Sequence, residues 1–514
     1  MFIRFKCDWS HGKNRLIAVV LNLNSSTVLN CLTMGSKKVL LVLVVTIMVL
    51  AGGCQRNLTA VRVVSQSQLP GPVEVLQPPL EIPRYFLDGV YHGLRNTETV
   101  FAMYRRQHFA PLWIENAMPS EKADSLVNVV LSARRYGLMP QDYHANEITK
   151  LSVAREDRAM MMRLDVILTD AFCSFANDLK HGRVRKKSSV SRDSVQLFAL
   201  RDLLGEHSVR NLLETQEPQY TAYKGLKKAL NAILDSISPA NQSMLLNGVT
   251  NDSVPSHRTV KKIEINLERW RNEKEELNGT YAWINVPAFM FYVIEQNEVV
   301  LESRVIVGAP ATATPLFSSE IECFTIFPYW YVPRKITVQE YLPVIKKDTT
   351  FITRNNFDVL DRNGRVQTLA SIDWKQYTAN NFPFTLRQRE GTENSLGIIK
   401  FIFDNPYAVF LHDTNAKRLF RNNQRAYSHG CIRLEKAFEF AHYLIGGGRT
   451  KVSGQLLDQY LRAQKRMTIS LMAPVPIHIR YYTAEEKDGL LLLHQDIYKK
   501  DQGLMQLFYN QRNF

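Results

Sequence analysis

The chain has 514 residues, of which 45% are hydrophobic and 22% charged, and its formal net charge is +15. This length predicts two to four domains, and the composition excludes a generally disordered chain. The basic residues are scattered and often lie beside acidic ones, as at Arg155 and Arg158, with no basic stripe interleaved with aromatic residues. We therefore expect no nucleic-acid partner, and a surface that suits an anionic cell wall or membrane.

The first 54 residues are typical of a secretory signal. Lys37 and Lys38 precede the apolar run 39–50, which is too short for a comfortable membrane span, and small residues then lead to Cys54. A cysteine after small residues resembles a bacterial lipobox, although the usual leucine lies one place too far upstream. Cys54 is therefore the predicted lipidation site, and Met34 is the expected translation start.

An uncleaved membrane anchor is the alternative interpretation of this segment. Both interpretations predict a periplasmic, membrane-anchored protein, with the choice between inner and outer membrane left open. Residues 55–84 are rich in Ser, Gln and Pro, which predicts a flexible tether.

Residues 85–272 are expected to form a helical scaffold domain. Apolar residues recur there at helical spacing, and Gly137 and Gly182 mark the expected ends of two helices. The polar stretch 240–258 is predicted to be a loop.

From 273 to 482 the pattern changes to runs rich in Val, Ile, Tyr and Phe, which predict strands, with a hairpin turn at residues 295–297. Residues 335–395 form a long insertion that suits a mobile lid. The tail 483–514 is expected to hold a final strand over 490–498. The predicted fold class is thus α+β, with a helical N-terminal half and a β-rich C-terminal half.

Two short segments carry the residues that suit catalysis. His412 ends a predicted strand, and Cys431 precedes a segment, 432–448, that is predicted to be a helix. A helix N-terminus stabilises an anion, so Cys431 is expected to form a thiolate nucleophile with His412 as its base. Gly430 permits a tight turn, the N–H of Cys431 suits an oxyanion hole, and Arg433 suits a substrate carboxylate.

Other interpretations of these residues remain open. An isolated cysteine in a helix is usually inert, and an isolated histidine is usually structural. His412, His429 and Cys431 are also candidate metal ligands, although no fourth ligand is evident. Cys173 and Cys323 lie in apolar runs, which favours buried free thiols over one disulfide bridge between them.

The spacing His412-x15-Ser428-His429-Gly430-Cys431-x-Arg433 is similar to the signature of L,D-transpeptidases with a YkuD-type catalytic domain. The resemblance extends over roughly residues 85–505 and is closest to the large Gram-negative type with a helical scaffold. Further segments that resemble this type are 135–138, 142–143, 265–270, 305–308, 314–315, 328–333, 387–391, 394–397 and 400–401. Two features depart from it: the stretch 240–258 is too short for an inserted peptidoglycan-binding module, and many members have Asn where Arg433 stands.

The resemblance implies a β-sandwich-like catalytic domain with a lid, in which Cys431 is acylated and His412 is the base. The backbone carbonyl of Asp413 would orient the His412 ring, and His429 would be structural or shape the oxyanion region near Gly430. The substrate-binding residues that it implies are Arg433, Ser428, Trp330, Tyr427 and Arg387. It implies no metal and no organic cofactor.

The implied reaction releases D-Ala from a tetrapeptide stem and transfers the acyl group to a diamino-acid amine, which forms a 3-3 cross-link. The resemblance also implies that carbapenems acylate the enzyme. The expected partners are peptidoglycan stem peptides as donor and acceptor, the membrane, and other cell-wall enzymes. Water, a D-amino acid or a protein lysine is an alternative acceptor. Two rival functions are a wall L,D-carboxypeptidase or endopeptidase, and a non-catalytic wall-tethering lipoprotein.

Overall fold

The computed structural model describes residues 93–510, apart from gaps at 117, 154–156, 185–196, 198, 200, 203, 205–206, 239, 241–243 and 245–253. The predicted signal, the lipidation site Cys54 and the tether 55–84 lie outside the described residues. Contacts divide the chain into the units 1–76 and 77–514, and the described residues all belong to the second. Within the described ranges, no helix has both the length and the apolar character needed to span a membrane.

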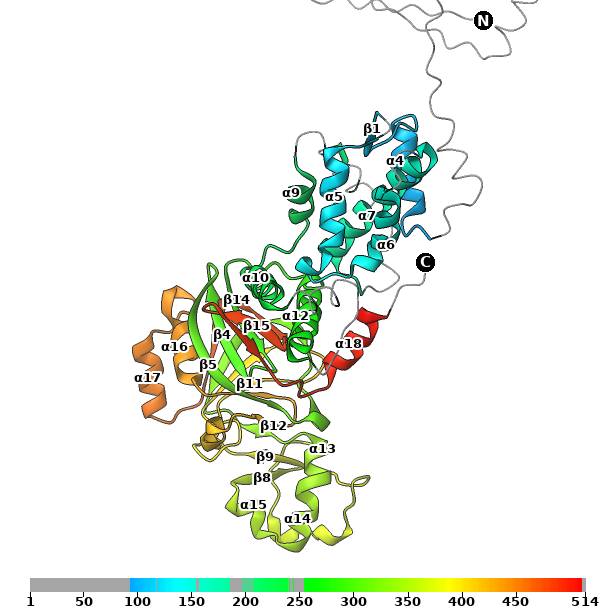
Figure 1. Ribbon diagram of the computed structural model, residues 1–514. Coiled ribbons are helices and arrows are strands. Elements are labelled where there is room, and N and C mark those ends of the chain that lie inside the picture. Colours follow the sequence, from blue (N-terminus) through cyan, green and yellow to red (C-terminus); the bar gives the residue numbers. More distant parts are fainter. Residues whose placement is uncertain are drawn as a thin grey trace, which may run out of the picture. The chain divides into compact units, whose positions relative to one another are not determined.

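The first part of the described chain is a group of helices around one apolar core (Figure 1). Its elements are α4 (Thr97–Arg106), β1 (Ile114–Glu115), β2 (Met118–Pro119), α5 (Glu121–Leu131), the 3-10 turns Ala133–Tyr136 and Pro140–Tyr143, α6 (Ala145–Val153), α7 (Arg158–His181) and α9 (Val209–Glu214). Gly137 and Gly182 have positive φ angles of 64° and 79° where the chain leaves a helix, which confirms both predicted helix ends.

Helix α7 is buried over most of its length, so its polar side chains need hydrogen-bond partners within the protein. Asp165 accepts backbone hydrogen bonds from Leu112, Trp113 and Ile114, at 2.7 to 3.1 Å, and a further one from the hydroxyl of Tyr104. A buried carboxylate with four such donors is stabilised by them against the loss of water. Asp165 thus fixes the chain before β1 onto the central helix.

Two further helices, α10 (Thr221–Ser236) and α12 (Pro255–Arg271), share an apolar core with aromatic residues of the β-rich part. The ring of Trp270 stacks on Tyr482 with centroids 4.4 Å apart and on Trp283 at 5.6 Å. Stacked aromatic rings bury a large apolar area at defined distances. This core joins α12 directly to the first strand of the β-rich part.

The β-rich part is one sheet of nine strands, which confirms the predicted α+β class. Its strands are β3 (Thr280–Asn285), β4 (Met290–Glu295), β5 (Glu298–Gly308), β6 (Phe317–Ile326), β10 (Ile399–Phe403), β11 (Leu411–His412), β12 (Ala426–Ser428), β13 (Ile432–Leu434) and β14 (Met467–Arg480). Their order is β12-β5-β13-β11-β10-β6-β14-β3-β4, and β4 also pairs with β5. Eight strands therefore close into a ring, which is a barrel-like form of the expected sandwich-like domain.

Local sequence explains how these strands connect. Gln296 and Asn297 have φ angles of 51° and 69°, so the predicted hairpin turn between β4 and β5 is confirmed as a turn of two left-handed residues. Alternate residues of the strands fill one core together with Phe440 of helix α16 (Ala437–Ile445) and Leu457 of helix α17 (Gly454–Arg462). The helix predicted over 432–448 is wrong at its start, because Ile432–Leu434 pairs with β5 and β11 as strand β13.

The residues expected to form a lid have an apolar core of their own. Three strands, β7 (Trp330–Tyr331), β9 (Thr385–Gln388) and β8 (Phe357–Leu360), form a small sheet in that order. The helical elements are α13 (Arg334–Ile336), the π turn Thr337–Tyr341, α14 (Leu342–Lys347) and α15 (Thr350–Arg354), followed by 3-10 turns at Leu369–Ser371 and Trp374–Gln376. In Figure 1 these elements form a group of their own. We call this group, residues 330–388, the lid.

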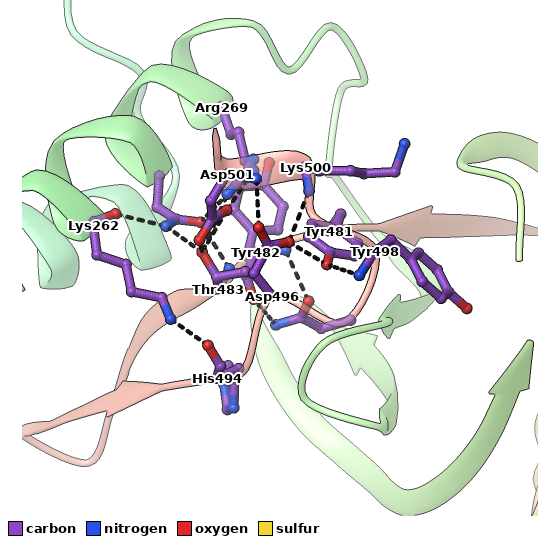
Figure 2. A network of polar contacts seen from close by, with 12 residues as sticks. Lys262, Arg269, Tyr481, Tyr482, Thr483, His494, Asp496, Tyr498, Lys500 and Asp501 are labelled. Atoms are coloured by element: carbon purple, nitrogen blue, oxygen red, sulfur yellow. Dashed lines mark hydrogen bonds and ion pairs between the residues drawn. The ribbon is translucent and has the colours of Figure 1, made fainter. Parts of the chain in front are cut away.

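The C-terminal segment returns to α12. It contains the hairpin β15 (Ala484–Lys487) and β16 (Leu490–Leu493), and then helix α18 (Lys500–Tyr509). The expected strand over 490–498 thus ends at residue 493, and the expected tail contains a helix. Figure 2 shows the polar network that holds this segment: Arg269 of α12 contacts Asp501 at 2.7 Å, and Asp501 accepts from the hydroxyl of Thr483 at 2.8 Å.

Candidate active site

Cys431 lies in a turn between β12 and β13. Strand β13 follows it directly, and the next helix, α16, begins only at Ala437. The expected stabilisation of a Cys431 thiolate by a helix N-terminus is therefore wrong, because no helix begins there. Burial raises the pKa of the Cys431 thiol above its ordinary value, while the Phe410 backbone and the positive charges of Lys400 and Arg433 act in the opposite direction.

The turn is held by hydrogen bonds within itself. The Ser428 hydroxyl donates to the Cys431 carbonyl at 2.5 Å and accepts from the Gly430 N–H at 3.2 Å. Gly430 has a φ angle of 114°, a conformation that residues with a side chain rarely adopt, so this turn requires glycine. The N–H of Cys431 has no hydrogen-bond partner among the described residues, so it is free to donate to a ligand.

A neighbouring loop supports the turn from the side. The Thr314 hydroxyl donates to the Gly430 carbonyl at 2.9 Å, and the Thr312 hydroxyl donates to the Ser428 carbonyl at 2.9 Å. The hydroxyl of Tyr498, from the C-terminal segment, donates to the Gly308 carbonyl at 2.7 Å and accepts from the Thr314 N–H at 3.1 Å. Tyr498 therefore fixes the loop that in turn fixes the cysteine.

His412 is the last residue of β11 and is buried, with 4% of its surface exposed. Its Nδ1 atom lies 2.5 Å from the backbone carbonyl oxygen of Asp413. A carbonyl only accepts, so Nδ1 carries the proton and Nε2 is the basic nitrogen of the neutral ring. Burial, with the positive charges of Arg433 and Lys400, lowers the pKa of His412 to about 3, against the pull of the backbone carbonyls of Asp413 and Leu396. His412 is thus a neutral proton acceptor at neutral pH.

The sheet register places His412 beside Lys400 and Arg433, the two cations that also act on the Cys431 thiol. Strands β11 and β13 are parallel, with Leu411 opposite Ile432 and His412 opposite Arg433. Leu411 and Ile432 point into the apolar core, so His412 and Arg433 point to the other face. Cys431 directly precedes Ile432, in the turn that leads into β13. The thiol also lies 4.0 Å from the carbonyl oxygen of Ala408, just before β11.

Two cations flank the cysteine. Arg433 is half-buried and has no hydrogen-bond or ion-pair partner among the described residues, so its guanidinium is available for a ligand carboxylate. Lys400 of β10 lies opposite His412, with its Nζ atom 3.5 Å from the centroid of the Phe410 ring. Lys400 belongs to one of the segments that carry the family resemblance, but the sequence analysis gave it no role. Its signal in the sequence is a lysine at the centre of the apolar strand IIKFIF.

The other residues predicted to form the site lie further from the thiol or face the lid. His429 is half-exposed, and its Nε2 atom contacts the carboxylate of Glu340 in the lid at 2.8 Å. The Tyr427 hydroxyl is exposed and accepts from Asn422 at 3.0 Å. Trp330 packs against the apolar core of the lid, and Arg387 is ion-paired with Asp358. The structure thus brings Ser428, Gly430 and Arg433 to the cysteine, and places Trp330 and Arg387 in contacts within the lid.

The described cysteines are not bonded to one another. Cys173, Cys323 and Cys431 are free thiols, so the bridge between Cys173 and Cys323 is not formed. Cys173 is fully buried, as expected, and Cys323 is half-buried. In the part of the chain that the structure describes, no group of three or more His, Cys, Asp or Glu side chains is placed to hold a metal ion.

Comparison with known proteins agrees with this architecture. Residues 98–230 match a scaffold domain, and residues 279–453 match the L,D-transpeptidase catalytic domain named YkuD. In this chain a scaffold domain therefore precedes an L,D-transpeptidase catalytic domain. Residues 279–453 belong to the YkuD family of these domains.

The individual proteins that this chain resembles have low sequence identity to it. A Haemophilus influenzae protein that is provisionally named an L,D-transpeptidase is 26% identical over 421 residues, which cover 80% of each chain. An L,D-transpeptidase structure from Mycobacterium smegmatis is 13% identical, with a TM-score of 0.17, over 39% of this chain and 58% of that one. L,D-transpeptidase 1 of Mycobacterium tuberculosis is 14% identical, with a TM-score of 0.15, over 39% and 62%. Both matches span less than two thirds of the solved chain.

Proposed function

We propose that this protein is a peptidoglycan L,D-transpeptidase that forms 3-3 cross-links through a thioester on Cys431. The observation that carries the proposal is the neutral His412 ring, fixed by the Asp413 carbonyl at the end of β11, the strand that pairs in parallel with the strand directly after Cys431. A neutral imidazole beside a thiol is the arrangement that nucleophilic catalysis by cysteine requires. The YkuD match supports the reaction class.

The first half of the reaction forms the thioester. Nε2 of His412 takes the proton of the Cys431 thiol as the sulfur attacks the carbonyl carbon at the L-centre of the diamino acid in a tetrapeptide stem. The C–S bond forms, and the carbonyl oxygen takes the displaced electron pair near the free N–H of Cys431. The C–N bond to D-Ala then breaks, and the imidazolium returns the proton to the departing amine.

The second half transfers the acyl group. The side-chain amine of a second stem attacks the thioester carbonyl and gives up one proton to His412. The C–S bond breaks, the sulfur leaves with its electron pair, and the proton returns to Cys431. Arg433 supports the proposal as the group that binds a stem carboxylate, because its donors have no partner among the described residues. If water replaces the amine, the same steps give a carboxypeptidase, which is the second candidate.

The location of the protein is proposed from the sequence alone. We infer that the chain acts in the periplasm and is attached to the membrane through Cys54 or its preceding apolar run. Incorporation of labelled palmitate into the wild type and its loss in Cys54→Ala would support the lipid attachment. Equal labelling of both would contradict it, and membrane retention without labelling would support the uncleaved anchor.

The function is tested by mass spectrometry of disaccharide-tetrapeptide incubated with the purified protein, beside a Cys431→Ala variant. Dimers that have lost one D-Ala, formed only when Cys431 is present, are the expected result. Tripeptide monomers alone would assign the protein to the carboxypeptidases. The same products from Cys431→Ala would contradict the proposed nucleophile, and no product from either protein would favour a tethering function.

A further inference from the structure

Lys400 occupies a costly position for a lysine. Its neighbours Ile399 and Phe401 are fully buried in the core of the closed sheet, so Lys400 must point to the opposite face. On that face it lies between Thr325 of β6 and His412 of β11, its partners in the sheet register. A lysine held among strands, away from the edge of a sheet, is rarely found there without a partner.

The contacts of Lys400 leave its charge uncompensated. The Nζ atom lies 3.5 Å from the ring centroid of Phe410, which is a cation–π contact with the strand segment beside Cys431. It has no carboxylate partner among the described residues. Burial lowers the pKa of Lys400, and the charges of Cys431 and Cys323 act to raise it, which identifies these two thiols as its titratable neighbours.

The charged groups around the thiol are predominantly positive. Lys400 comes from β10, His412 from β11 and Arg433 from β13. On the lid side, Glu340 is already paired with His429, and Tyr341 interacts with Arg433. The cations Lys400 and Arg433 therefore act on the thiol, and Glu340 of the lid is already paired with His429.

We propose that Lys400 is a positioning residue for the nucleophile, and that its ammonium group holds the Cys431 sulfur in the thiolate form during attack. The two cations then have separate tasks. The planar guanidinium of Arg433 suits a substrate carboxylate, which neutralises it when substrate binds, whereas the compact ammonium of Lys400 remains as the charge for the sulfur. The inference rests on the proposed function only in taking Cys431 as the nucleophile.

The test is the pH dependence of alkylation of Cys431 in the full-length protein by iodoacetamide, measured by mass spectrometry of the peptide that contains Cys431. Lys400→Met should move the midpoint of the profile upward by about one pH unit and slow alkylation at pH 7 by about tenfold. Lys400→Arg keeps the charge and should stay within about threefold of the wild type. Lys487→Met, which removes a lysine from β15 outside the closed sheet, should leave the profile unchanged.

Lys400→Gln is the second neutral variant, and we expect the same upward shift of its alkylation profile. It allows the test to be made if Lys400→Met fails to fold. An unchanged profile in either folded neutral variant would overturn the inference. A loss of reactivity toward iodoacetate alone, with the iodoacetamide profile unchanged, would assign Lys400 to a substrate carboxylate and also overturn it. Wild-type Cys431 that reacts no faster than Cys323 would instead contradict the proposed function, so the two failures are distinguishable.

Discussion

His429, in the turn between β12 and β13, is paired with Glu340 of the lid, with 2.8 Å between the imidazole Nε2 and the carboxylate oxygen. Both side chains are about half exposed, at 48% and 46%. A pair of this kind contributes less than about 1 kcal/mol, because water screens the charges. The contact therefore joins the lid to the turn only weakly.

Glu340→Gln should consequently loosen the lid without unfolding the protein. We expect backbone hydrogen exchange in residues 334–347 to become a few times faster, while the free energy of unfolding changes by less than about 0.5 kcal/mol. The matched control is Asp458→Asn, which alters the similarly exposed pair of His442 with Asp458 at 3.4 Å in the helices α16 and α17. Equal exchange in the lid of both variants would refute the link.

His412→Gln should remove the general base and keep the shape of the site. Loss of a general base usually lowers the rate by about 10²- to 10⁴-fold, and we expect this range for kcat of dimer formation. His478→Gln is the control, because His478 is also a buried histidine but lies on β14, where its ring contacts the Ser318 hydroxyl. A similar loss of activity in both variants would mean that His412 acts only through stability.

Stability should fall as the solution becomes mildly acidic. Burial lowers the pKa of His412 to about 3 and that of His478 to about 4. Below pH 6.5 the unfolded chain binds protons at these histidines that the folded chain does not bind, so their contribution is complete above pH 6.5 and is lost as the pH falls toward 4. Proton binding at each histidine of the unfolded chain should lower the free energy of unfolding by about 1.4 kcal/mol for each unit by which the pH falls below 6.

Urea unfolding at pH 7.0, 6.0 and 5.0 measures this slope. His412→Gln should lose about half of the slope, since it removes one of the two histidines. A slope that is identical in the variant and the wild type would show that His412 is not neutral in the folded protein.

Arg433→Met should weaken substrate binding more than Arg433→Lys. A charge-assisted pair is worth about 1.5 to 3 kcal/mol, so kcat/KM should fall about 10- to 100-fold in the Met variant, mainly through KM. The Lys variant keeps the charge and loses the planar fork, and it should lie in between. Arg304→Met, at an exposed arginine that is paired with Glu435 on the sheet, should leave KM unchanged. An unchanged KM in Arg433→Met would exclude the carboxylate contact.

Tyr498→Phe should loosen the turn that carries the nucleophile. The change removes one hydroxyl that makes two hydrogen bonds to the loop 308–314, so we expect stability to fall by about 1 to 2 kcal/mol and turnover to fall with it. Tyr460→Phe on α17 removes a hydroxyl without a hydrogen-bond partner among the described residues and should be neutral. Thermal unfolding and turnover of the two variants, measured side by side, check the expectation; equal behaviour would contradict it.

The sequence singles out His412 and Cys431 because they belong to a motif with fixed spacing, and their catalytic roles stay predictions. The contribution of Lys400 depends on strand register, and a lysine within an apolar strand is compatible with either face until the partners of the strand are known. The helix predicted directly after Cys431 was wrong because a segment as short as Ile432–Leu434, with one apolar residue on each side of Arg433, fits both a strand and a helix.

Tertiary contacts decide the parts that local patterns leave open. Helix α18 contains Gly503 and has no side-chain cap at its start, so its intrinsic tendency to form a helix is weak. It forms because Phe508 is buried against Ile265 of α12 and Met139. Tyr498 shows the same limitation, since its link to the Gly308 loop joins segments 190 residues apart.

The closed ring of strands also bears on aggregation. An open sheet offers the unpaired backbone groups of its edge strands to other chains. Here β4 pairs with β5, so each of the eight strands in the ring has neighbours on both sides, and among the described strands of this sheet the free edge is the three-residue strand β12. A strand of three residues is a poor template for pairing between molecules. While the ring stays closed, we expect the folded domain to remain dispersed even at high local concentration.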